Sequence, residues 1–386
     1  MLHRIYFSVC GEGYGHSSRD MAIAKELTRD GASVLMGGYG YVLERLKYGF
    51  DAVEVEKEFE MVGNKGAFDL KATIFKSKSQ AFSFSRIISQ EKKIMENFNA
   101  TCVVADGRIA AIFAAFKLGI PCVIISNQTS IEQFFLESKF YLRFIGKQVE
   151  FTLKTTMALA EVVLIPDFPP PHTVCLKNLS KSRHVMKKQV FTGPVVSFDE
   201  SAGSTVNDTQ RPYILTLLGG HSFRLPIFSA ILKIADRFPD MDFLIFTKFK
   251  GNDAPKNVII KEFAKDIFNY LQNASLIITQ AGHSTAMEIL TLGKPALIIP
   301  DEGQLEQENN ASRMKELGVC ETLEYSELEP KSLFETINLL LNDAGFREKA
   351  GHYSIMSKTM NGSRKAADMI QELSNRIQSY SVGVKG

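Results

Sequence analysis

Paired cysteines are lacking in this sequence. Its five cysteines are scattered, and none forms a Cys-x-x-Cys pair or a Cys/His cluster with the spacing of a zinc site: Cys10, Cys102, Cys122, Cys175 and Cys320. Several lie in apolar runs that are typical of strands, which favours reduced thiols in the core of a cytoplasmic protein. The spacing therefore excludes a zinc site built from cysteine pairs.

Long apolar runs are lacking as well. No stretch approaches the roughly 20 apolar residues that a helix needs to cross a bilayer. The first apolar run, "IYFSV", is short and leads directly into a glycine-rich motif, so we expect no cleavable signal. The protein is therefore expected to be soluble or peripherally bound to a membrane.

The sequence also lacks an excess of charge of one sign. The 45 basic and 43 acidic side chains give a formal net charge of +2. This balance argues against a protein built mainly around nucleic acid, although it is compatible with local basic patches. We expect no nucleic-acid partner.

Short β-branched runs alternate with amphipathic helical patterns along the whole chain. The strand-like runs of the first half are "RIYFSV", "ASVLMGG", "CVVAD", "PCVIIS" and "EVVLIP", and those of the second half are "YILTLLGG", "MDFLIFT", "NVIIKEF", "SLIITQAG" and "PALIIP". This alternation predicts an α/β fold with parallel sheets covered by helices on both faces. The length of 386 residues favours two such domains.

A polar segment rich in Ser, Asp and Thr separates the two halves. It covers residues 197–212 and is typical of an interdomain linker. We therefore predict one Rossmann-like domain over residues 1–196 and a second over residues 213–362, with a cleft between the carboxyl edges of their sheets. A final helix, over residues 363–386, packs either on its own domain or on the first.

The first motif that carries chemistry is "CGEGYGHSSRD", where a strand gives way to a helix. Gly11, Gly13 and Gly15 permit close approach of a ligand to the backbone, and the helix start offers free N–H groups. The spacing matches neither a dinucleotide nor a Walker fingerprint. His16 stands at the helix N-terminus, which disfavours its cationic form and keeps it available as a base. The alternatives are a tight turn and a histidine that only caps the helix.

The second motif, "LLGGHSFR", again ends a buried strand in glycines. Ser222 is placed to cap the following helix and Arg224 to reach an anionic group. A purely structural turn is the alternative. The residues of this motif that we predict to contact a ligand are Gly219, Gly220, His221, Ser222 and Arg224.

The third motif covers residues 279–318 and is the most informative. A strand ends at Gly282, and the helix that follows has an N-terminus suited to a diphosphate. After the next strand comes "EGQLEQENNA", whose carboxylates and carboxamides suit the vicinal hydroxyls of a sugar. A solvated acidic helix start is the alternative for that segment. The predicted ligand contacts of this motif are Gly282, His283, Ser284, Thr285, Glu288, Glu306 and Gln307.

Taken together, these motifs resemble the MurG-like glycosyltransferases of family 28. The family pattern of a Gly-x-x-Thr-x-x-Glu helix, a "GxPALxxP" strand and a late Gln followed by Asn-Ala corresponds here to "GHSTAME", "GKPALIIP" and "EQENNA". The preceding "IIKEFAKDIFNYLQNASLIITQAG", which contains Phe263, is similar to the family's base-contacting segment. The N-terminus is closest to a microbial branch with "GEGxGHxxR", in which "D-x-E" and "NQ" follow later strands. Here Asp106 and "NQ" are retained and Arg108 stands at the acidic position.

The resemblance implies the GT-B arrangement and a UDP-sugar held by the second domain. Glu288 would bind the ribose, and Gln307 with Glu306 the sugar hydroxyls. His16 would deprotonate the acceptor hydroxyl, with inversion at the anomeric carbon, and Asp106 would orient His16 unless it only caps a helix. Helix N-termini would stabilise the leaving diphosphate without a metal or other cofactor. The acceptor side would comprise Gly13, Gly15, Arg19, Asn127 and Gln128.

Basic residues are interleaved with phenylalanines near the predicted cleft, which favours an anionic membrane surface and a lipid-linked acceptor. We therefore expect the protein at the cytoplasmic face of the cell membrane, bound peripherally. A helix that packs its Phe face on a core, and a polyanionic polymer as partner, are the alternatives. The first stretch contains Phe68, Lys71, Phe75, Lys76, Lys78, Phe82, Phe84, Arg86 and Lys92, and further basic stretches are "FFLESKFYLRFIGKQVEF" and "KNLSKSRHVMKK".

Other functions remain open at the level of sequence. A non-hydrolysing UDP-sugar epimerase shares the two-domain architecture but needs its own acid and base carboxylates and no separate acceptor. A non-catalytic nucleotide-sugar-binding protein has no need of His16. A dinucleotide-dependent oxidoreductase is disfavoured, because neither half has a GxGxxG turn followed by an acidic ribose partner.

Overall fold

The computed structural model describes residues 3–12, 14–58, 63–64, 67–68, 83–136, 140–196, 208–209, 211–219, 221–251, 253–262 and 267–383. Several sequence-based predictions lie outside these residues and stay predictions. They are the ligand contacts of Gly13, Gly220 and Phe263, most of the linker, and the basic and aromatic residues Lys71, Phe75, Lys76, Lys78 and Phe82.

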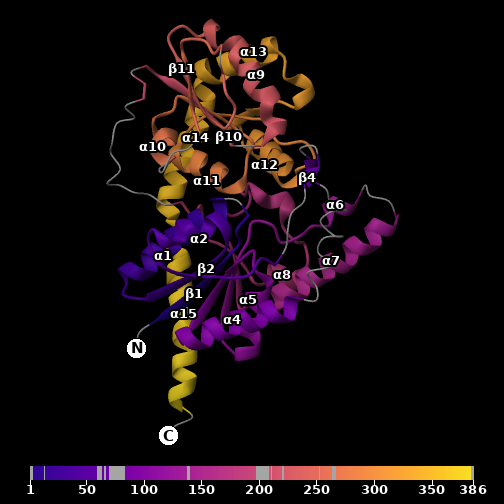
Figure 1. Ribbon diagram of the computed structural model, residues 1–386, viewed down its shortest axis with the longest axis vertical. Helices are drawn as coiled ribbons and strands as arrows, with labels where there is room; N and C mark the ends of the chain where they lie inside the picture. Colours follow the sequence, from indigo (N-terminus) through magenta and orange to yellow (C-terminus); the bar gives the residue numbers. More distant parts are fainter. Residues whose placement is uncertain are drawn as a thin grey trace.

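Two parallel sheets, each covered by helices, form the two lobes of the molecule (Figure 1). The first has the order β3-β2-β1-β6-β7-β8-β9 and the second the order β12-β11-β10-β13-β14-β15. The predicted α/β architecture with two Rossmann-like units is confirmed. Strand order reverses between β1 and β6 and again between β10 and β13. Ligands of such sheets bind at the carboxyl ends of the strands beside these switch points.

Most strands lie where the β-branched runs predicted them, but β3, β9 and β15 lie outside those runs. Those of the first sheet are β1 (Arg4–Val9), β2 (Ser33–Gly38), β3 (Asp51–Glu54), β6 (Cys102–Asp106), β7 (Cys122–Ile125), β8 (Val162–Ile165) and β9 (Gln189–Phe191). Those of the second are β10 (Tyr213–Gly219), β11 (Asp242–Thr247), β12 (Val258–Lys261), β13 (Leu276–Thr279), β14 (Ala296–Ile298) and β15 (Cys320–Thr322). A short antiparallel pair, β4 (Gly63–Asn64) and β5 (Ala67–Phe68), stands apart.

Burial on both faces explains why these strands are nearly continuous apolar runs. In β1, Ile5 and Phe7 pack into one core, whereas Tyr6 between them packs into the core on the opposite face. Successive side chains of a strand point to opposite faces, so a strand covered on both sides needs apolar residues at every position. The same holds for the second sheet, where Leu215 and Ile214 belong to different cores.

Helices cover both sheets. In the first half they are α1 (Tyr14–Arg29), α2 (Gly40–Lys47), α4 (Phe84–Phe98), α5 (Ile109–Leu118), α6 (Gln133–Leu136), α7 (Phe140–Leu159), η1 (Cys175–Asn178) and α8 (Arg183–Met186). In the second half they are η2 (Ser222–Arg224), α9 (Leu225–Ile234), η3 (Ala235–Arg237), α10 (Phe268–Asn273), α11 (His283–Leu292), α12 (Leu305–Glu316), η4 (Tyr325–Glu327), α13 (Pro330–Asn342), α14 (Ala344–Met360) and α15 (Gly362–Gly383). No helix among the described residues is long and apolar enough to cross a membrane.

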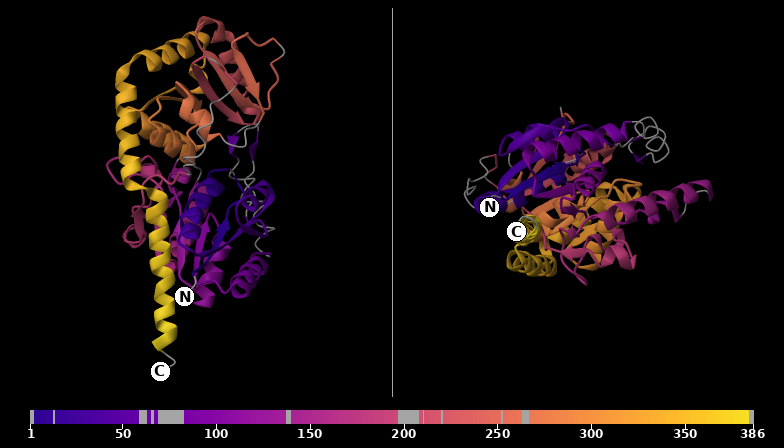
Figure 2. Two further views of the ribbon diagram at one scale, coloured as in Figure 1. Left: turned by 90° about the vertical axis from the view of Figure 1, so that its left-hand side faces the viewer. Right: turned by 90° about the horizontal axis from the view of Figure 1, so that it is seen from below.

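The last helix, α15, returns to the first domain. It runs down the side of that lobe (Figure 2), and its Ala366, Ala367 and Ile370 are fully buried in the same core as Ile5 and Phe7 of β1. The sequence left open which domain this helix contacts. The apolar side of α15 therefore packs the C-terminal part of the chain onto the first domain, on the other side of the linker.

Candidate functional site

A cavity of about 570 Å³ lies between the carboxyl edges of the two sheets. Both domains contribute to its wall. The first domain supplies residues from the β1–α1 turn and from the ends of β2, β6 and β7, and the second supplies the start of α11 and one residue of α12. Its lining comprises Cys10, Glu12, Gly15, His16, Arg19, Tyr39, Glu58, Asp106, Gly107, Arg108, Ile125, Ser126, Asn127, Gln128, Gly282, His283, Ser284, Thr285 and Glu306.

Two helix N-termini meet at this cavity. Gly15, in the first turn of α1, approaches Ser284, in the first turn of α11, so closely that a Cβ added to the glycine would lie 2.6 Å from the serine Oγ. Both helix starts carry free N–H groups and partial positive charge. Gly282 precedes α11, and no atom lies within 4 Å of where its Cβ would stand. The cavity therefore has two neighbouring ends suited to an anion.

His16 and Asp106 form a hydrogen-bonded pair in the wall of the cavity. The Nδ1 of His16 lies 2.7 Å from Oδ1 of Asp106, which ends β6 beside β1. Gly107 follows with φ +68°, and a Cβ there would lie 2.8 Å from the Cβ of Cys10, so the turn beside the pair requires glycine. The His16 side chain is 28% exposed, whereas that of Asp106 is only 1% exposed.

Arg19 fixes the protonation of this pair. Its Nε donates to Oδ2 of Asp106 over 2.6 Å, and its Nη2 donates to Oδ1 over 2.5 Å. Burial alone would raise the pKa of Asp106, but the charges and hydrogen bonds of Arg19 and His16 hold it below its usual value. Nη2 of Arg19 also lies 3.0 Å from Nδ1 of His16. The bond from Nδ1 to Asp106 is the shorter, at 2.7 Å, and an ionised carboxylate only accepts, so this bond requires the hydrogen on Nδ1 and leaves the lone pair of the neutral ring on Nε2.

A bridge of polar side chains crosses the cavity from Arg19. Nη1 of Arg19 donates to Oδ1 of Asn127 over 3.0 Å, and Nδ2 of Asn127 donates to Oε1 of Glu306 over 2.8 Å. The sequence assigned Arg19 and Asn127 to the acceptor side and Glu306 to the donor sugar. In the structure, these three side chains bind one another, and Gln128 lines the cavity beside them.

Several predicted donor contacts are held by protein groups. Nε of Arg224 donates to Oδ1 of Asp301 over 2.9 Å, and Gln307 both accepts from the backbone N–H of Asp301 and donates to its carboxylate. The anionic group that Arg224 reaches is therefore internal, and each end of the Gln307 amide already makes one hydrogen bond to Asp301. The predicted capping by Ser222 is wrong, because no side chain caps η2 or α9. His221 and Phe223 stack over 5.2 Å between ring centroids.

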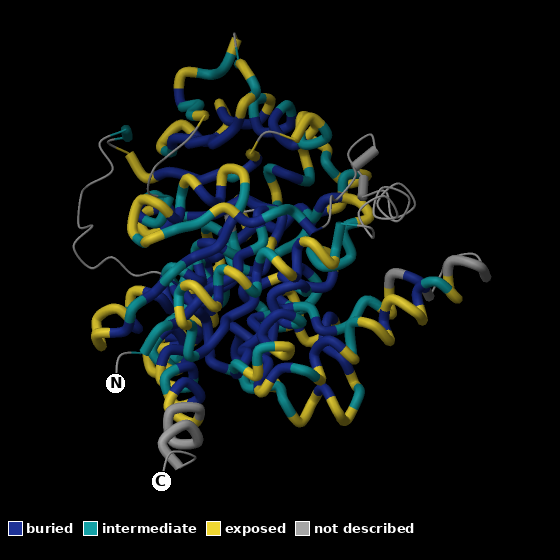
Figure 3. Tube along the Cα trace, turned by 60° about the horizontal axis from the view of Figure 1, so that its bottom comes forward, coloured by how far each residue is buried: buried dark blue, intermediate teal, exposed yellow. Residues whose placement is uncertain are grey.

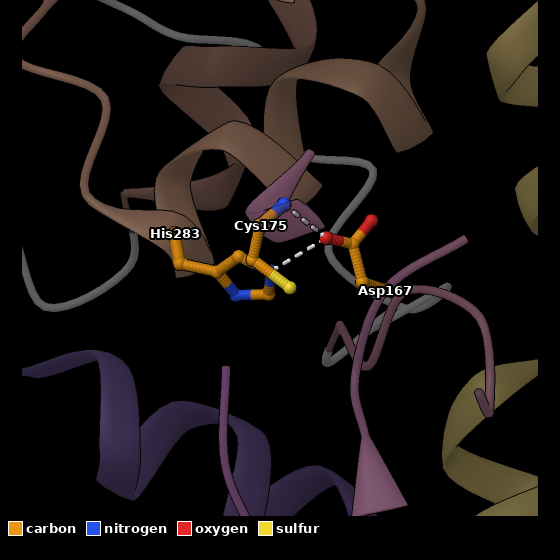
Figure 4. A group of neighbouring side chains, drawn as sticks. All are labelled: Asp167, Cys175 and His283. Carbon is orange, nitrogen blue, oxygen red and sulfur yellow. Dashed lines mark hydrogen bonds and ion pairs between the residues drawn. The ribbon is translucent and has the colours of Figure 1, made fainter. Parts of the chain in front are cut away.

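The His283 side chain faces the other domain rather than the cavity centre. Its Nε2 lies 3.1 Å from Oδ2 of Asp167, beyond β8, and Cys175 lies beside them (Figure 4). These three side chains have the composition of a metal site. However, Asp167 also accepts from the backbone N–H groups of Phe168, Val174 and Cys175, and burial raises the pKa of the Cys175 thiol well above its usual value. The group is therefore an interdomain contact, and only the backbone of His283 is left for a ligand.

Glu288 lies on α11 outside the wall of the cavity. Burial raises its pKa to about 7, and the nearby charge of Arg45 on α2 lowers it. The structure thus brings Glu288 toward the first domain, and its predicted contact with a ribose is not tested by this arrangement.

Asn309 and Asn310, which the sequence grouped with the sugar contacts, belong instead to a buried chain of amides. Nδ2 of Asn309 donates to Asn178 of η1 over 2.7 Å, and Nδ2 of Asn178 donates to Asn310 over 3.2 Å. Asn310 then donates to the carbonyl of Ala281, whose φ of +62° is unusual for a residue with a side chain. The chain supports the strained turn that starts α11.

Sequence reasoning missed one group in the wall. Arg108 is buried, and its Nη2 lies 2.9 Å from Glu91 of α4, while its Nε lies 3.3 Å from Glu58. Burial raises the pKa of Glu58 to about 7, Arg108 lowers it and Glu91 raises it. A buried arginine signals carboxylate partners, but nothing in the sequence says which of the distant glutamates they are.

Known proteins resemble this chain in sequence and in fold. The family model "Glycosyltransferase family 28 C-terminal domain" matches residues 240–372. A protein of Methanosarcina mazei described as an uncharacterized glycosyltransferase is 33% identical over 379 residues, which cover 96% of this chain and 98% of the relative. This chain belongs to the MurG-like glycosyltransferases of family 28. The N-terminal "GEGxGHxxR" branch stays a prediction.

More distant matches agree on the fold of this glycosyltransferase. A UDP-N-acetylglucosamine--N-acetylmuramyl-(pentapeptide) pyrophosphoryl-undecaprenol N-acetylglucosamine transferase of Bacillus cereus is 25% identical over 313 residues, covering 76% of this chain and 78% of the relative. The crystal structure of Acinetobacter baumannii MurG superimposes with a TM-score of 0.63 at 20% identity, covering 96% of this chain and 100% of that one. The calicheamicin glycosyltransferase CalG4 gives 0.69 at 17% identity, covering 98% and 100%. The fold is GT-B.

The hydrogen bond between Asn127 and Glu306 is expected to contribute to sugar transfer. Replacing Asn127→Asp removes the donor and sets two carboxylates against each other, so we expect kcat/KM for sugar transfer to fall roughly tenfold, or about 1.4 kcal/mol. Adding Glu306→Gln restores a donor with reversed polarity and recovers part of the loss. The measurement is a double-mutant cycle on kcat/KM.

Glu308→Gln is the matched control for this cycle, because Glu308 lies on the same helix and contacts Gly303 instead of Asn127. Combined with Asn127→Asp, it should recover nothing. Additive effects of Asn127→Asp and Glu306→Gln would show that the bridge does not contribute to transfer.

Proposed function

We propose that the protein is an inverting, metal-independent glycosyltransferase that moves a hexose or N-acetylhexosamine from a UDP-sugar to a hydroxyl group of a lipid-linked acceptor. The reaction would take place at the cytoplasmic face of a membrane. The observation that carries this proposal is the convergence, in one interdomain cavity, of the N-termini of α1 and α11 with His16, whose Nε2 has no partner among the residues that the structure describes.

The donor diphosphate would lie where the two helix N-termini meet. The backbone N–H groups at the start of α11, which include those of Ser284 and Thr285, have no partner within the helix and give its N-terminus a partial positive charge. Preorganised donors of this kind stabilise the charge that develops on a leaving group. They would thereby supply the stabilisation that a metal ion provides in other transferases. Support comes from the matched family domain and from VinC, a neighbour in fold whose structure was solved "in complex with DTDP".

The acceptor proton would pass to His16. The ionised Asp106 would stabilise the imidazolium once the proton arrives from the attacking hydroxyl. Attack from the side opposite the diphosphate gives inversion. Roles for Gly219, Glu288 and Gln307 toward the nucleotide and sugar stay part of this proposal.

The lipid-linked acceptor is supported by α7. This helix projects from the first domain (Figure 1), and exposed and half-buried segments follow one another along it (Figure 3). It carries Phe144 and Phe151, which are 61% and 67% exposed. Arg143 and Lys147 lie on the same exposed part of the helix. Aromatic side chains beside cations suit an anionic bilayer surface, where each cation contributes about 1 kcal/mol. The printed name of the Bacillus cereus relative includes an undecaprenol substrate.

A donor screen tests the proposed function as a whole. Because a ligand that binds only the folded state stabilises it by about 2.7 kcal/mol at 100 times its Kd, a UDP-sugar should raise the melting temperature. GDP- and dTDP-sugars at the same concentration serve as controls. A rise with one of these alone would overturn the uridine assignment, and no rise with any nucleotide sugar would overturn the donor site.

Replacing His16→Ala separates binding from chemistry. The variant should keep the Kd for the donor, measured by calorimetry, because the backbone of the helix N-termini is unchanged. We expect kcat to fall by about 10²-fold or more, as for loss of a general base. Near-normal transfer by this variant would refute the assignment of His16 as the base, but it would not contradict the proposed donor site.

Flotation with liposomes tests the membrane surface. With vesicles containing an anionic lipid, the wild type should float in low salt and remain below in high salt, since the attraction is screened. The combined change Phe144→Ser, Phe151→Ser and Lys147→Glu should abolish flotation. Ile355→Ser, at a position 69% exposed on α14, is the matched control and should float normally. Flotation of the α7 variant equal to that of the control would exclude α7 as the surface.

A further inference from the structure

Asp20 is a buried carboxyl group for which the mechanism above has no use. It lies on α1, the helix that carries His16 and Arg19, and its side chain is fully buried. Among the described residues, no nitrogen or hydroxyl group donates a hydrogen bond to either of its oxygens. A carboxylate without donors in a buried place is strongly disfavoured, because its charge has lost its water without compensation.

The neighbouring group that acts on Asp20 is a second carboxyl group, that of Asp106. Two carboxyl groups can share a hydrogen bond only if one of them carries a proton. Asp106 receives hydrogen bonds from His16 and twice from Arg19, and these donors require it to be the ion. A proton between the two carboxyl groups would therefore belong to Asp20, which has no donor of its own.

The electrostatic surroundings agree with this assignment. Burial and the negative charge of Asp106 raise the pKa of Asp20 well above its usual value, and Arg19 lowers it. Among the described residues, Asp106 at the end of β6 and Arg19 on the same helix are the charged groups that act most strongly on Asp20. The single positive charge of Arg19 is already bound to Asp106 through two hydrogen bonds.

We propose that Asp20 is a positioning residue that remains a neutral carboxylic acid at the working pH, donates its proton to Asp106, and so keeps His16 in its basic form. This proposal rests on the proposed role of His16 as general base. The donated hydrogen bond would add a fourth donor to the Asp106 carboxylate, beside the three from His16 and Arg19. A charged Asp20 would instead put two negative charges beside one guanidinium, and the second charge would hold a proton on His16, which would then be unable to accept one from the acceptor.

Folding stability tests the protonation of Asp20 without reference to activity. The unfolded chain releases the Asp20 proton above about pH 3.9, whereas the folded protein retains it. Asp20 therefore makes the wild type less stable as pH rises from there toward the folded pKa. Asp20→Asn, which keeps a donor to Asp106 without titrating, lacks this loss. We expect the ratio of the unfolding constants, wild type over variant, to grow by up to about tenfold per pH unit above pH 4.

The control is Asp240→Asn, which removes an exposed carboxyl group in the second domain and should give a ratio that hardly changes with pH. If Asp20→Asn does not fold, Asp20→Ser retains a smaller O–H donor and tests the same linkage. A ratio that is constant with pH, or a variant that loses stability relative to wild type as pH rises, overturns the proposal, because Asp20 would then be ionised.

The pH profile of transfer tests the effect on His16. Removing the donor with Asp20→Ala should lower kcat about tenfold, and Asp20→Asn should recover most of that loss. The acidic limb of kcat/KM, which reports the general base, should coincide for wild type and Asp20→Asn. A limb displaced to lower pH by a unit or more in Asp20→Asn means that a charge was removed and contradicts the proposal. If His16→Ala transfers normally, the base assignment fails, yet the stability ratio still decides whether Asp20 is neutral.

Discussion

The ionised carboxylate of Asp106 is the group on which the arrangement of the cavity depends. It is placed by the end of β6, next to β1 in the middle of the first sheet, and it accepts from His16 and Arg19. A buried carboxylate is stable only when donors surround it. The need to satisfy this one charge therefore fixes which nitrogen of His16 carries hydrogen, where Arg19 lies, and which side of the imidazole faces the cavity.

The hydrogen bonds that begin at Asp106 continue across the domain boundary. Arg19 continues to Asn127 and then to Glu306 of the second domain, while His283 of the second domain binds Asp167 of the first. Opening the cleft would break these bonds and leave polar groups unpaired, at about 1–3 kcal/mol for each group that stays buried. The position of α11 relative to His16 is thus set by buried polar contacts rather than by the linker.

Much of this could be predicted from the sequence, and the failures share a cause. Alternating apolar runs fixed the strands, and the rule that parallel strands end at one edge correctly put Asp106 near His16. The partners of Arg224, Gln307 and His283 could not be found in this way. Each is held by a carboxylate distant in the fold, Asp301 or Asp167, and the pairing of buried charges depends on packing that periodicity does not reveal.

The start of α1 serves both the proposed base, His16, and the proposed diphosphate site. This double use explains why the histidine needs several supporting groups. In the proposed reaction, a proton arrives at His16 while negative charge develops on the diphosphate beside the same helix end. The N-terminus of α1 favours the second charge and opposes the first. An isolated histidine would therefore be a poor base at the place where the leaving group is best stabilised. Asp106 compensates, because its carboxylate lies 2.7 Å from Nδ1 of the imidazole, and Arg19 keeps that carboxylate ionised through two hydrogen bonds.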